Sequence, residues 1–240
     1  MALIKPVIAQ GKHLLIRAGL KLAMKTRSVR ALGVREIGRE AGLNPNTFYR
    51  HFSSLDDLGL AILNEVIGNI RQPLRNMRRE AAESVAGQVP SARLPSEYWV
   101  LSLQKTKLVA RETIRRYFEF VLKNPEAFTI GVSEVNGASP TMRQAIQGLI
   151  ADFASDLADD IRILQLLPMV SDEAVRELST IIIRQIFMLS TDYIDTPGKR
   201  GEMEDMAYSF MINLVAGTIG MEVSDQATLT ELLAVLRCEG

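Results

Sequence analysis

The amino-acid sequence predicts an all-α fold, in which a small three-helix domain at the N-terminus is followed by a larger helical domain. Apolar residues recur at intervals of three and four, first at Leu14, Ala18 and Leu22 and later through residues 58–66 and 114–122. No stretch shows the convincing alternation of apolar and polar residues that is typical of a strand. Glycine and proline fall between the periodic segments, where helices are expected to end.

The expected elements follow one another simply along the chain. Three short helices precede residue 53 and longer, more acidic ones follow, which makes about nine or ten helices, with a short one over residues 225–236 near the end. Loops are expected where glycine, proline and asparagine gather, at residues 86–95, 136–140, around Pro168 and 195–201. We expect residues 1–55 to form the first domain and residues 56–240 the second.

The composition is that of an ordinary globular protein. Of the 240 residues, 47% are hydrophobic and 23% are charged, which supplies a core without an excess of charge. Lys5, Pro6 and Gln10 interrupt the N-terminal apolar stretch, so no secretory signal is expected. The longest uncharged run, residues 206–221, falls short of the ~20 apolar residues of a spanning helix. The single Cys238 fits a reducing compartment, and we expect a soluble, cytoplasmic protein without membrane contact.

The net charge of zero hides an asymmetry along the chain. Residues 1–55 carry four lysines and six arginines against Glu36 and Glu40, a net charge of +8, and residues 56–240 carry −8. A small basic head on an acidic body is typical of proteins that bind nucleic acid. A basic stretch of this size is also common as a solvated face, so the charge alone leaves both interpretations open.

Residues 34–52 have the pattern of two helices joined by a tight turn. Val34, Ile37 and Ala41 form the apolar stripe of a short first helix. Gly42 follows just past its end, where glycine adopts left-handed backbone angles at little cost. A helix, a short turn with glycine and a second helix make the helix-turn-helix layout.

The second helix of this motif is expected to begin at Pro45 with Asn44 as its cap, because an asparagine oxygen accepts free amide hydrogens and proline needs none. Phe48 and Phe52, four residues apart, are expected to face the interior. The remaining surface carries amide, hydroxyl and cationic side chains suited to phosphates and base edges: Asn46, Thr47, Tyr49, Arg50 and His51. The motif therefore predicts DNA binding.

The N-terminal region closely resembles the TetR family over roughly the first 65 residues. The strings that carry the resemblance are Arg35-Glu36-Ile37, Glu40-Ala41-Gly42, Thr47 to Phe52 and Asp56-Asp57-Leu58. The resemblance implies a three-helix DNA-binding domain joined by a fourth helix to a helical ligand-binding and dimerisation domain. Family members are homodimers on palindromic operators, and most are repressors that a small ligand releases or tightens.

The same resemblance implies roles for single residues. The implied phosphate contacts are Arg35, Thr47, Tyr49 and His51, and the implied base or groove contacts are Asn46 and Arg50. The sequence departs from the family at Leu55, where many members have a lysine that contacts phosphate. That contact is lost here or replaced by Ser53 or Ser54, so the affinity or its salt dependence is expected to be modest.

Part of the larger domain resembles the branch of TetR repressors that controls unsaturated fatty-acid synthesis or desaturation in gamma-proteobacteria. The similarity is spread over about forty residues, from Phe118-Glu119-Phe120 through Asn124-Pro125 to Phe153. It implies a long-chain acyl-CoA or acyl-carrier thioester as effector, which needs an apolar tunnel with cations at its mouth. The expected lining residues are Trp99, Phe118, Phe128, Arg143, Phe153 and Phe187, with Arg115, Arg116 and Arg184 as further cations. Core packing or surface exposure is the alternative for each of them.

Two long segments, residues 173–193 and 203–221, are apolar on more than one side, which predicts a neighbour on each face. We expect them to form a homodimer interface, in which Ala216 and Gly220 allow close helix crossing. Arg184 interrupts an apolar run and is expected to form a salt bridge across that interface.

An enzyme is the first alternative class, and the residue inventory argues against it. The two histidines, His13 and His51, lie in the basic head, and no catalytic or nucleotide-binding motif is present. Carboxylate pairs such as Asp159-Asp160 are expected to be solvated faces. Histidine and cysteine are too scarce for a metal site, and no cofactor is expected.

Two other DNA-binding proteins share part of the prediction. A repressor of an efflux or catabolic gene has the same fold with a different hydrophobic effector, and the aromatic content of 6% tilts weakly towards a lipid-like one. An architectural DNA-binding protein does not need a helical body of about 180 residues. The sequence leaves open the operator, the regulated genes and the direction of the effector's action.

Overall fold

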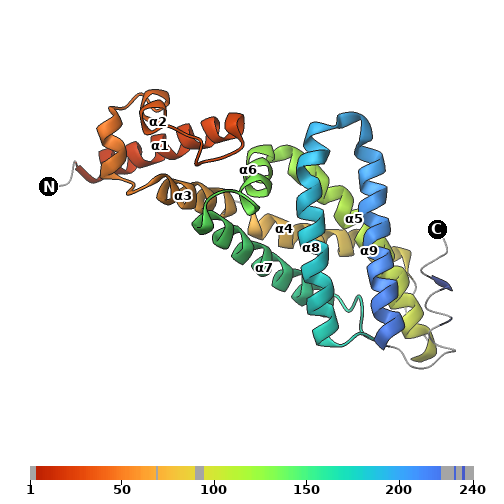
Figure 1. Cartoon of the computed structure of the whole chain (residues 1–240). Helices are drawn as coiled ribbons and strands as arrows, with labels where there is room; N and C mark the ends of the chain where they lie inside the picture. Colours follow the sequence, from red (N-terminus) through yellow and green to blue (C-terminus); the bar gives the residue numbers. More distant parts are fainter. Residues whose placement is uncertain (1–3, 69, 90–94, 223–229, 231–233, 236–240) are drawn as a thin grey trace. The chain divides into compact units, whose positions relative to one another are not determined.

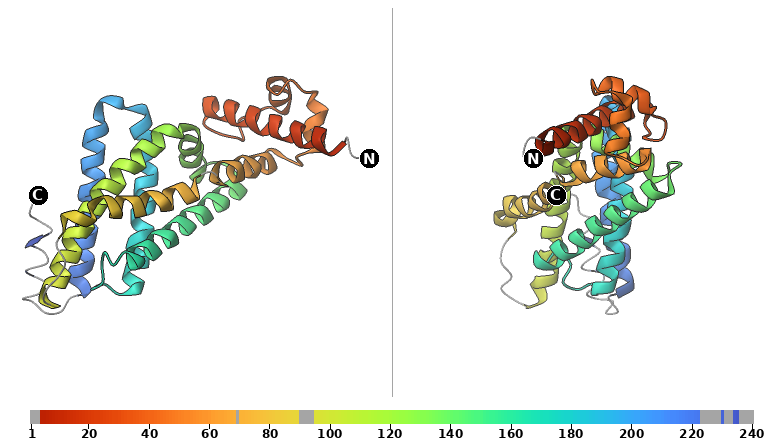
Figure 2. Two further views of the ribbon diagram at one scale, coloured as in Figure 1. Left: turned by 180° about the vertical axis from the view of Figure 1, so that it is seen from behind. Right: turned by 90° about the vertical axis from the view of Figure 1, so that its left-hand side faces the viewer.

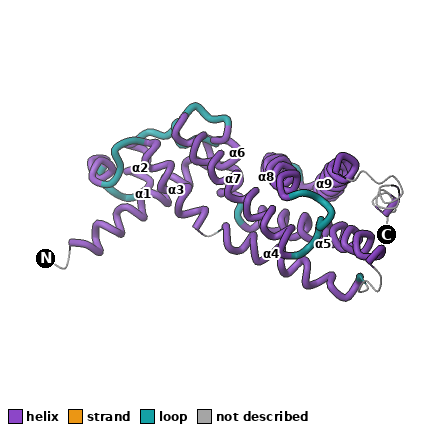
Figure 3. Tube along the Cα trace, turned by 90° about the horizontal axis from the view of Figure 1, so that it is seen from below, coloured by secondary structure: helices purple, strands orange, loops and turns teal. Residues whose placement is uncertain are grey.

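The computed structural model describes residues 4–68, 70–89, 95–222, 230, 234 and 235. This described part consists of helices and loops and has no strand, as Figure 3 shows. The chain divides into two compact units, residues 1–70 with 124–149 and residues 71–123 with 150–240. The predicted all-α fold, a helix-turn-helix domain followed by a larger helical domain, is confirmed.

The first unit begins with α1 (Ile4–Thr26), α2 (Val34–Glu40), the 3-10 helix η1 (Pro45–Arg50) and α3 (Leu55–Gly68), which Figure 1 draws in red to brown. The first helix, α1, has 23 residues and is longer than predicted, because Pro6 falls in its first turn, where no amide hydrogen is needed. It ends at Thr26, because the next residue, Arg27, has a φ of 53°, outside the helical region. Fully buried side chains from all four elements form the core: Leu15, Ile37, Phe48, Leu58 and Ile62.

Two later segments complete the first unit, namely α6 (Pro125–Val135) and the part of α7 (Pro140–Ile163) up to residue 149. Helix α6 packs on α1 and α3. Met142 of α7 is fully buried, and its sulfur lies 2.6 Å from the place of a Cβ on Gly59 of α3. The unit around the helix-turn-helix therefore extends past residue 55, and the domain boundary expected there stays a prediction.

The second unit contains the rest of α7 and four further long helices. They are α4 (Arg71–Val85), α5 (Pro95–Lys123), α8 (Asp172–Asp195) and α9 (Arg200–Glu222), with the 3-10 helices η2 (Ala86–Gln88) and η3 (Pro197–Lys199). Helix α5 packs on α4, α8 and α9, and α8 and α9 run side by side in Figures 1 and 2. Phe118 of α5 stacks on Tyr193 of α8 with ring centroids 4.2 Å apart.

The loop at residues 136–139 and the connection at residues 196–199, which contains η3, interrupt the α-helices close to the predicted positions. None of the described helices combines the length and apolar character needed to cross a membrane. The short helix expected over residues 225–236 lies outside the described residues except at 230, 234 and 235, and Cys238 lies outside them altogether.

Candidate functional site

The turn between α2 and η1 is held by two glycines. Gly42 adopts a φ of 66°, which confirms the left-handed conformation predicted for it. Gly38 lies in the preceding helix, and its carbonyl accepts a hydrogen bond from the amide of Leu43 at 2.9 Å. A Cβ on Gly38 would lie 3.0 Å from the Cα of Pro45, so glycine is what allows η1 to start this close to α2. The sequence pattern singles out Gly42 but not Gly38.

The 3-10 helix η1 is anchored as the sequence predicts. Oδ1 of Asn44 accepts a hydrogen bond from the amide of Asn46 at 2.9 Å, which caps the helix. Phe48 is fully buried and Phe52 nearly so, and both therefore face the core. Tyr49, between them, is 67% exposed. An exposed aromatic hydroxyl beside two buried rings gives η1 one inner and one outer face.

All six predicted DNA-contacting residues lie on α2, on η1 or directly after η1. Arg35, Asn46, Tyr49 and Arg50 are exposed, and Thr47 and His51 are half-buried. The ring of His51 packs on α1, where its Nε2 lies 3.1 Å from the place of a Cβ on Gly11. The contact of these six side chains with DNA stays a prediction.

Ion pairs neutralise some charges of this region and leave others available. Lys21 pairs with Glu40, and its hydrogen bond holds the pKa of that carboxyl below its ordinary value. Arg30 pairs with Asp56 at 3.2 Å. Arg35 and Arg50 have no ion-pair partner within the described part of the chain, so their charges are available to a polyanion.

The start of α3 uses its two serines internally. Oγ of Ser54 accepts a hydrogen bond from the amide of Asp57 at 3.1 Å. The amide and the hydroxyl of Ser53 both donate to the Asp57 carboxylate, at 2.9 and 3.2 Å. This is a reciprocal cap of the helix start. A phosphate contact by the hydroxyl of Ser53 would compete with its bond to Asp57, whereas Ser54 uses only an acceptor lone pair and keeps its hydroxyl hydrogen to donate. Replacement of the missing lysine contact by a serine stays a prediction.

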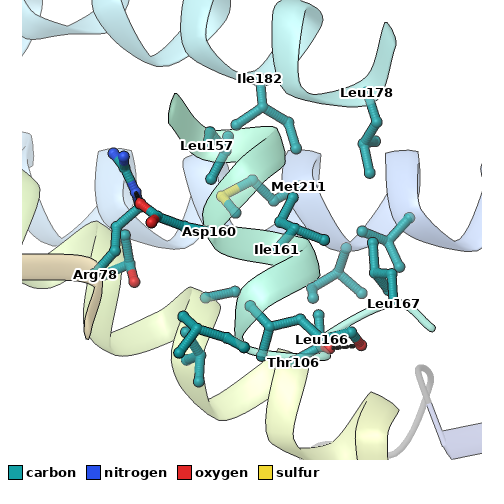
Figure 4. Close-up of a pocket in the computed structure, with 16 residues that line it drawn as sticks. Arg78, Thr106, Leu157, Asp160, Ile161, Leu166, Leu167, Leu178, Ile182 and Met211 are labelled. Atoms are coloured by element: carbon teal, nitrogen blue, oxygen red, sulfur yellow. Dashed lines mark hydrogen bonds and ion pairs between the residues drawn. The ribbon is translucent and has the colours of Figure 1, made fainter. Parts of the chain in front are cut away.

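The second unit contains a cavity with a volume of about 50 Å³, lined from α4, α5, α7, α8 and α9 (Figure 4). Aliphatic side chains and one thioether form most of its wall, among them Val109, Ala110, Ile161, Leu178, Ile182 and Met211. An internal apolar space of this kind suits a small ligand with an apolar body.

One charged pair lines this apolar space. Nε of Arg78 donates a hydrogen bond to Oδ2 of Asp160 at 2.7 Å, and only 6% and 1% of these residues are exposed. Figure 4 shows the pair at one side of the cavity. Nη2 of Arg78 and Oδ1 of Asp160 have no hydrogen-bond partner in the described structure. The prediction of a solvated face at Asp159-Asp160 is therefore wrong for Asp160, although Asp159 is exposed.

Asp160 is buried because it belongs to a stripe of aspartates that faces the arginines of α4. The stripe recurs every fourth residue of α7, from Asp152 to Asp160. Its middle member, Asp156, is buried and accepts hydrogen bonds from Arg71 at 2.8 Å and Arg75 at 2.9 Å. Burial raises the pKa of Asp156, but the hydrogen bond and charge of Arg71 outweigh it and hold this pKa below its ordinary value.

The six predicted effector-binding residues belong to both units. Phe128 and Arg143 belong to the first unit, and Trp99, Phe118, Phe153 and Phe187 belong to the second. None of them lines the cavity. Phe118 is fully buried and stacks on Tyr193. Its surroundings therefore agree with a role in core packing, the alternative that the sequence left open for this residue. The binding of an effector by this set stays a prediction.

Three further arginines were expected as cations near the effector: Arg115, Arg116 and Arg184. Arg115 and Arg116 of α5 both pair with Glu112, at 2.8 and 2.6 Å. The hydrogen bond of Arg115 and then that of Arg116 lower the pKa of Glu112 to about 2, against the effect of burial. Arg184 is exposed on α8. Its salt bridge across a dimer interface stays a prediction.

Comparison with known proteins finds a family model that covers the helix-turn-helix. Residues 15–62 match the family described as bacterial regulatory proteins, tetR family. Members of this family are transcriptional regulators that bind DNA, not enzymes. The helix-turn-helix predicted from the sequence lies within the matched residues.

Two solved structures align with most of this chain. A tetR-family transcriptional regulator from Streptomyces coelicolor has 17% sequence identity and a TM-score of 0.54, over 97% of this chain and 90% of that one. A putative tetR family transcription regulator from Shewanella sp. PV-4 has 17% identity and a TM-score of 0.49, over 85% of this chain and 95% of that one. The first of these supports a common fold across both units.

Proposed function

We propose that the chain is a ligand-responsive transcriptional repressor that binds a palindromic operator as a homodimer. The observation that carries the proposal is that Tyr49 and Arg50 of η1 and Arg35 of α2 are exposed, in a region of net charge +8 that matches tetR-family regulators. Hydroxyl, amide and guanidinium groups on one short helix are suited to a duplex groove and its phosphates. Operator binding requires the protein to act in the cytoplasm, where bacterial DNA lies.

Within this interface we assign two kinds of contact. Arg35, Thr47, Tyr49 and His51 hold phosphates, and Asn46 and Arg50 reach base edges or the groove. The side chain of Tyr49 is exposed next to the buried Phe48, which suits a contact of its hydroxyl with the DNA backbone. Arg50 has no internal ion pair among the described residues, and a guanidinium is suited to bidentate contact with guanine.

In vitro selection from a pool of random duplexes tests this function directly. We expect the full-length protein to enrich an inverted repeat whose half-sites lie about one helical turn, ~34 Å, apart. Binding of all duplexes with equal affinity would contradict sequence-specific repression and would favour an architectural DNA-binding protein.

The homodimer is supported by apolar side chains left in contact with solvent on α8 and α9. Ile181 of α8 and Met206 of α9 are each about half exposed in the single chain. Among the residues that the structure describes, none has an atom within 4 Å of a Cβ added to Gly217 or Gly220, so nothing in this part of the chain covers that face of α9. Sedimentation equilibrium of the full-length protein tests the proposal, and a concentration-independent monomer would contradict it.

The effector has two candidate classes. The resemblance of residues 118–153 favours a long-chain acyl thioester or fatty acid. The cavity favours a different, more compact hydrophobic effector, because about 50 Å³ is far smaller than a long acyl chain and the residues expected to line an acyl tunnel lie elsewhere. We therefore propose a compact hydrophobic effector, the class that fits the cavity better.

Native mass spectrometry of the freshly purified protein separates the two classes. A co-purified acyl-CoA or fatty-acid mass would establish the acyl candidate. A small adduct, or an adduct-free protein that operator assays show to respond to a compact ligand, would establish the second candidate.

A further inference from the structure

We propose that Lys12 of α1 binds a phosphate of the DNA backbone next to the one that His51 holds, so that the DNA interface extends from α2 and η1 onto α1. The inference rests on the proposed function, because it adds one side chain to the DNA contacts assigned there. It follows from the way in which α1 packs against the residues after η1. No motif of the sequence singles out this lysine.

A glycine brings α1 close to the end of η1. Gly11 of α1 is buried, and Nε2 of His51 lies 3.1 Å from the place that a Cβ on Gly11 would take. The ring of His51 therefore occupies space that a larger residue at position 11 would need for its own side chain. Lys12 follows Gly11 in α1, so its backbone also lies beside the end of η1.

The side chain of Lys12 lies over the residue that follows His51. Its Nζ is 5.7 Å from the centroid of the Phe52 ring, within the ~6 Å of a cation–π contact. The same ring lies 6.4 Å from the ring of His51, between centroids. Lys12 is exposed, and a cation–π contact at an exposed site contributes only about 0.5–1 kcal/mol. The uncharged ring therefore orients the ammonium group without neutralising it.

No carboxylate compensates the charge of Lys12 within the part of the chain that the structure describes. The two carboxylates at the start of α3, the helix after Phe52, are engaged elsewhere. Asp56 pairs with Arg30 at 3.2 Å, and Asp57 accepts the hydrogen bonds that cap the start of α3. The ammonium group of Lys12 is therefore available to an external anion.

A backbone phosphate is the anion that suits this position. An ammonium group is a compact point charge and lacks the planar fork with which arginine recognises guanine, so it binds phosphates without reading sequence. His51, which we assign to a phosphate, packs around the same Phe52 ring as Lys12. Two phosphate-binding groups on one ring suit the same phosphate or consecutive phosphates of one strand.

The salt dependence of DNA binding tests the contact in the full-length protein. Each phosphate that a protein neutralises adds about 0.9 to the slope of log affinity against log salt concentration. We expect Lys12→Gln to reduce this slope by about 0.9, both on the operator obtained by selection and on a random duplex. Between about 50 and 200 mM salt, the affinity ratio of wild type to Lys12→Gln should shrink about 3.5-fold. Lys12→Arg keeps the charge and should keep the wild-type slope.

Lys21→Gln is the matched control. It removes the same charge from the same helix, but the ammonium group of Lys21 is paired with Glu40, so the slope should stay unchanged. Lys12 and Lys21 are both exposed, and equal melting temperatures show that the variants fold. A wild-type slope in Lys12→Gln would overturn the inference. An equal reduction in Lys21→Gln would also overturn it, because the effect would then come from net charge and not from a contact.

Neutral methylphosphonate groups, placed one at a time in the operator, locate the phosphate. Neutralising the phosphate that Lys12 binds should weaken wild type but not Lys12→Gln, and a second cycle with His51→Ala should identify the same phosphate or its neighbour. Distant phosphates for the two residues would overturn their common placement around Phe52. If the protein binds all duplexes equally and Lys12→Gln still reduces the salt slope, the proposed repressor function fails and the phosphate contact stands.

Discussion

The carboxylate of Glu134 in α6 accepts a hydrogen bond from the backbone amide of Val29, in the segment between α1 and α2, at a distance of 2.7 Å. The same oxygen accepts the hydroxyl of Ser28 at 3.0 Å. Glu134 is completely buried within the first unit, and its second oxygen has no hydrogen-bond partner in the described structure. This side chain therefore ties α6 to the segment that precedes the helix-turn-helix.

Replacing Glu134 by alanine is expected to destabilise the first unit by about 2 kcal/mol, because the buried amide of Val29 loses its acceptor. Glu134→Gln retains an acceptor oxygen, so it should reduce the stability of the first unit by less. Hydrogen exchange of the Val29 amide measures the effect at the contact itself. Glu126→Ala, an exposed change on the same helix, is the control. Equal protection of the Val29 amide from hydrogen exchange in both alanine variants would show that the Glu134 carboxylate does not stabilise this contact.

The alanine variant of Gly38 is expected to lose stability and operator binding together. Its new Cβ meets the backbone of Pro45 at 3.0 Å, and backbone cannot move aside as a flexible side chain does. The expected loss is about 1–3 kcal/mol in urea unfolding. Gly148→Ala is the matched control, because an added Cβ there meets nothing within 4 Å and alanine favours the helix by about 1 kcal/mol. A Gly38→Ala protein as stable as wild type would show that the turn relaxes freely.

The features that the sequence predicts correctly are local. Gly42 in the left-handed region, Asn44 as a cap and Phe48 facing inward each depend on residues a few positions away. Propensity and periodicity act over the same short range. The helix-turn-helix could therefore be predicted residue by residue, whereas the length of α1 could not, because no glycine or capping residue marks its start.

The features that the sequence does not predict join distant residues. Glu134 and Val29 are 105 positions apart, and Arg78 and Asp160 are 82 apart. Asp160 looks like part of a solvated acidic face until α4 supplies an opposing row of arginines. Fourfold spacing of charges on two separate helices is the signal that links them, but a single sequence does not say which helices are neighbours.

Two substitutions on η1 are expected to weaken operator binding in different ways. Tyr49→Ala removes a phosphate contact and should weaken binding to specific and random duplexes by the same factor. Arg50→Ala removes a groove contact and should cost about 1–3 kcal/mol and relax specificity at one base pair. Fluorescence anisotropy against a panel of single-base operator variants distinguishes them. Because both side chains are exposed, unchanged melting temperatures serve as the folding control. Relaxed specificity in Tyr49→Ala would contradict the assignment.

Acid is expected to remove the stability that Glu112 contributes through its two arginines. Arg115 and Arg116 lower its folded-state pKa from 4.5 to about 2, so the unfolded chain binds the proton more readily. The contribution is therefore complete above pH 4.5 and is lost as the pH falls through about 2. Urea unfolding of Glu112→Gln and wild type at several pH values checks this, since the difference between them should shrink towards pH 2. Glu83→Gln, exposed on α4, should show no such trend. If the difference in unfolding free energy between Glu112→Gln and wild type stays constant with pH, the substitution acts through packing and not through the loss of charge.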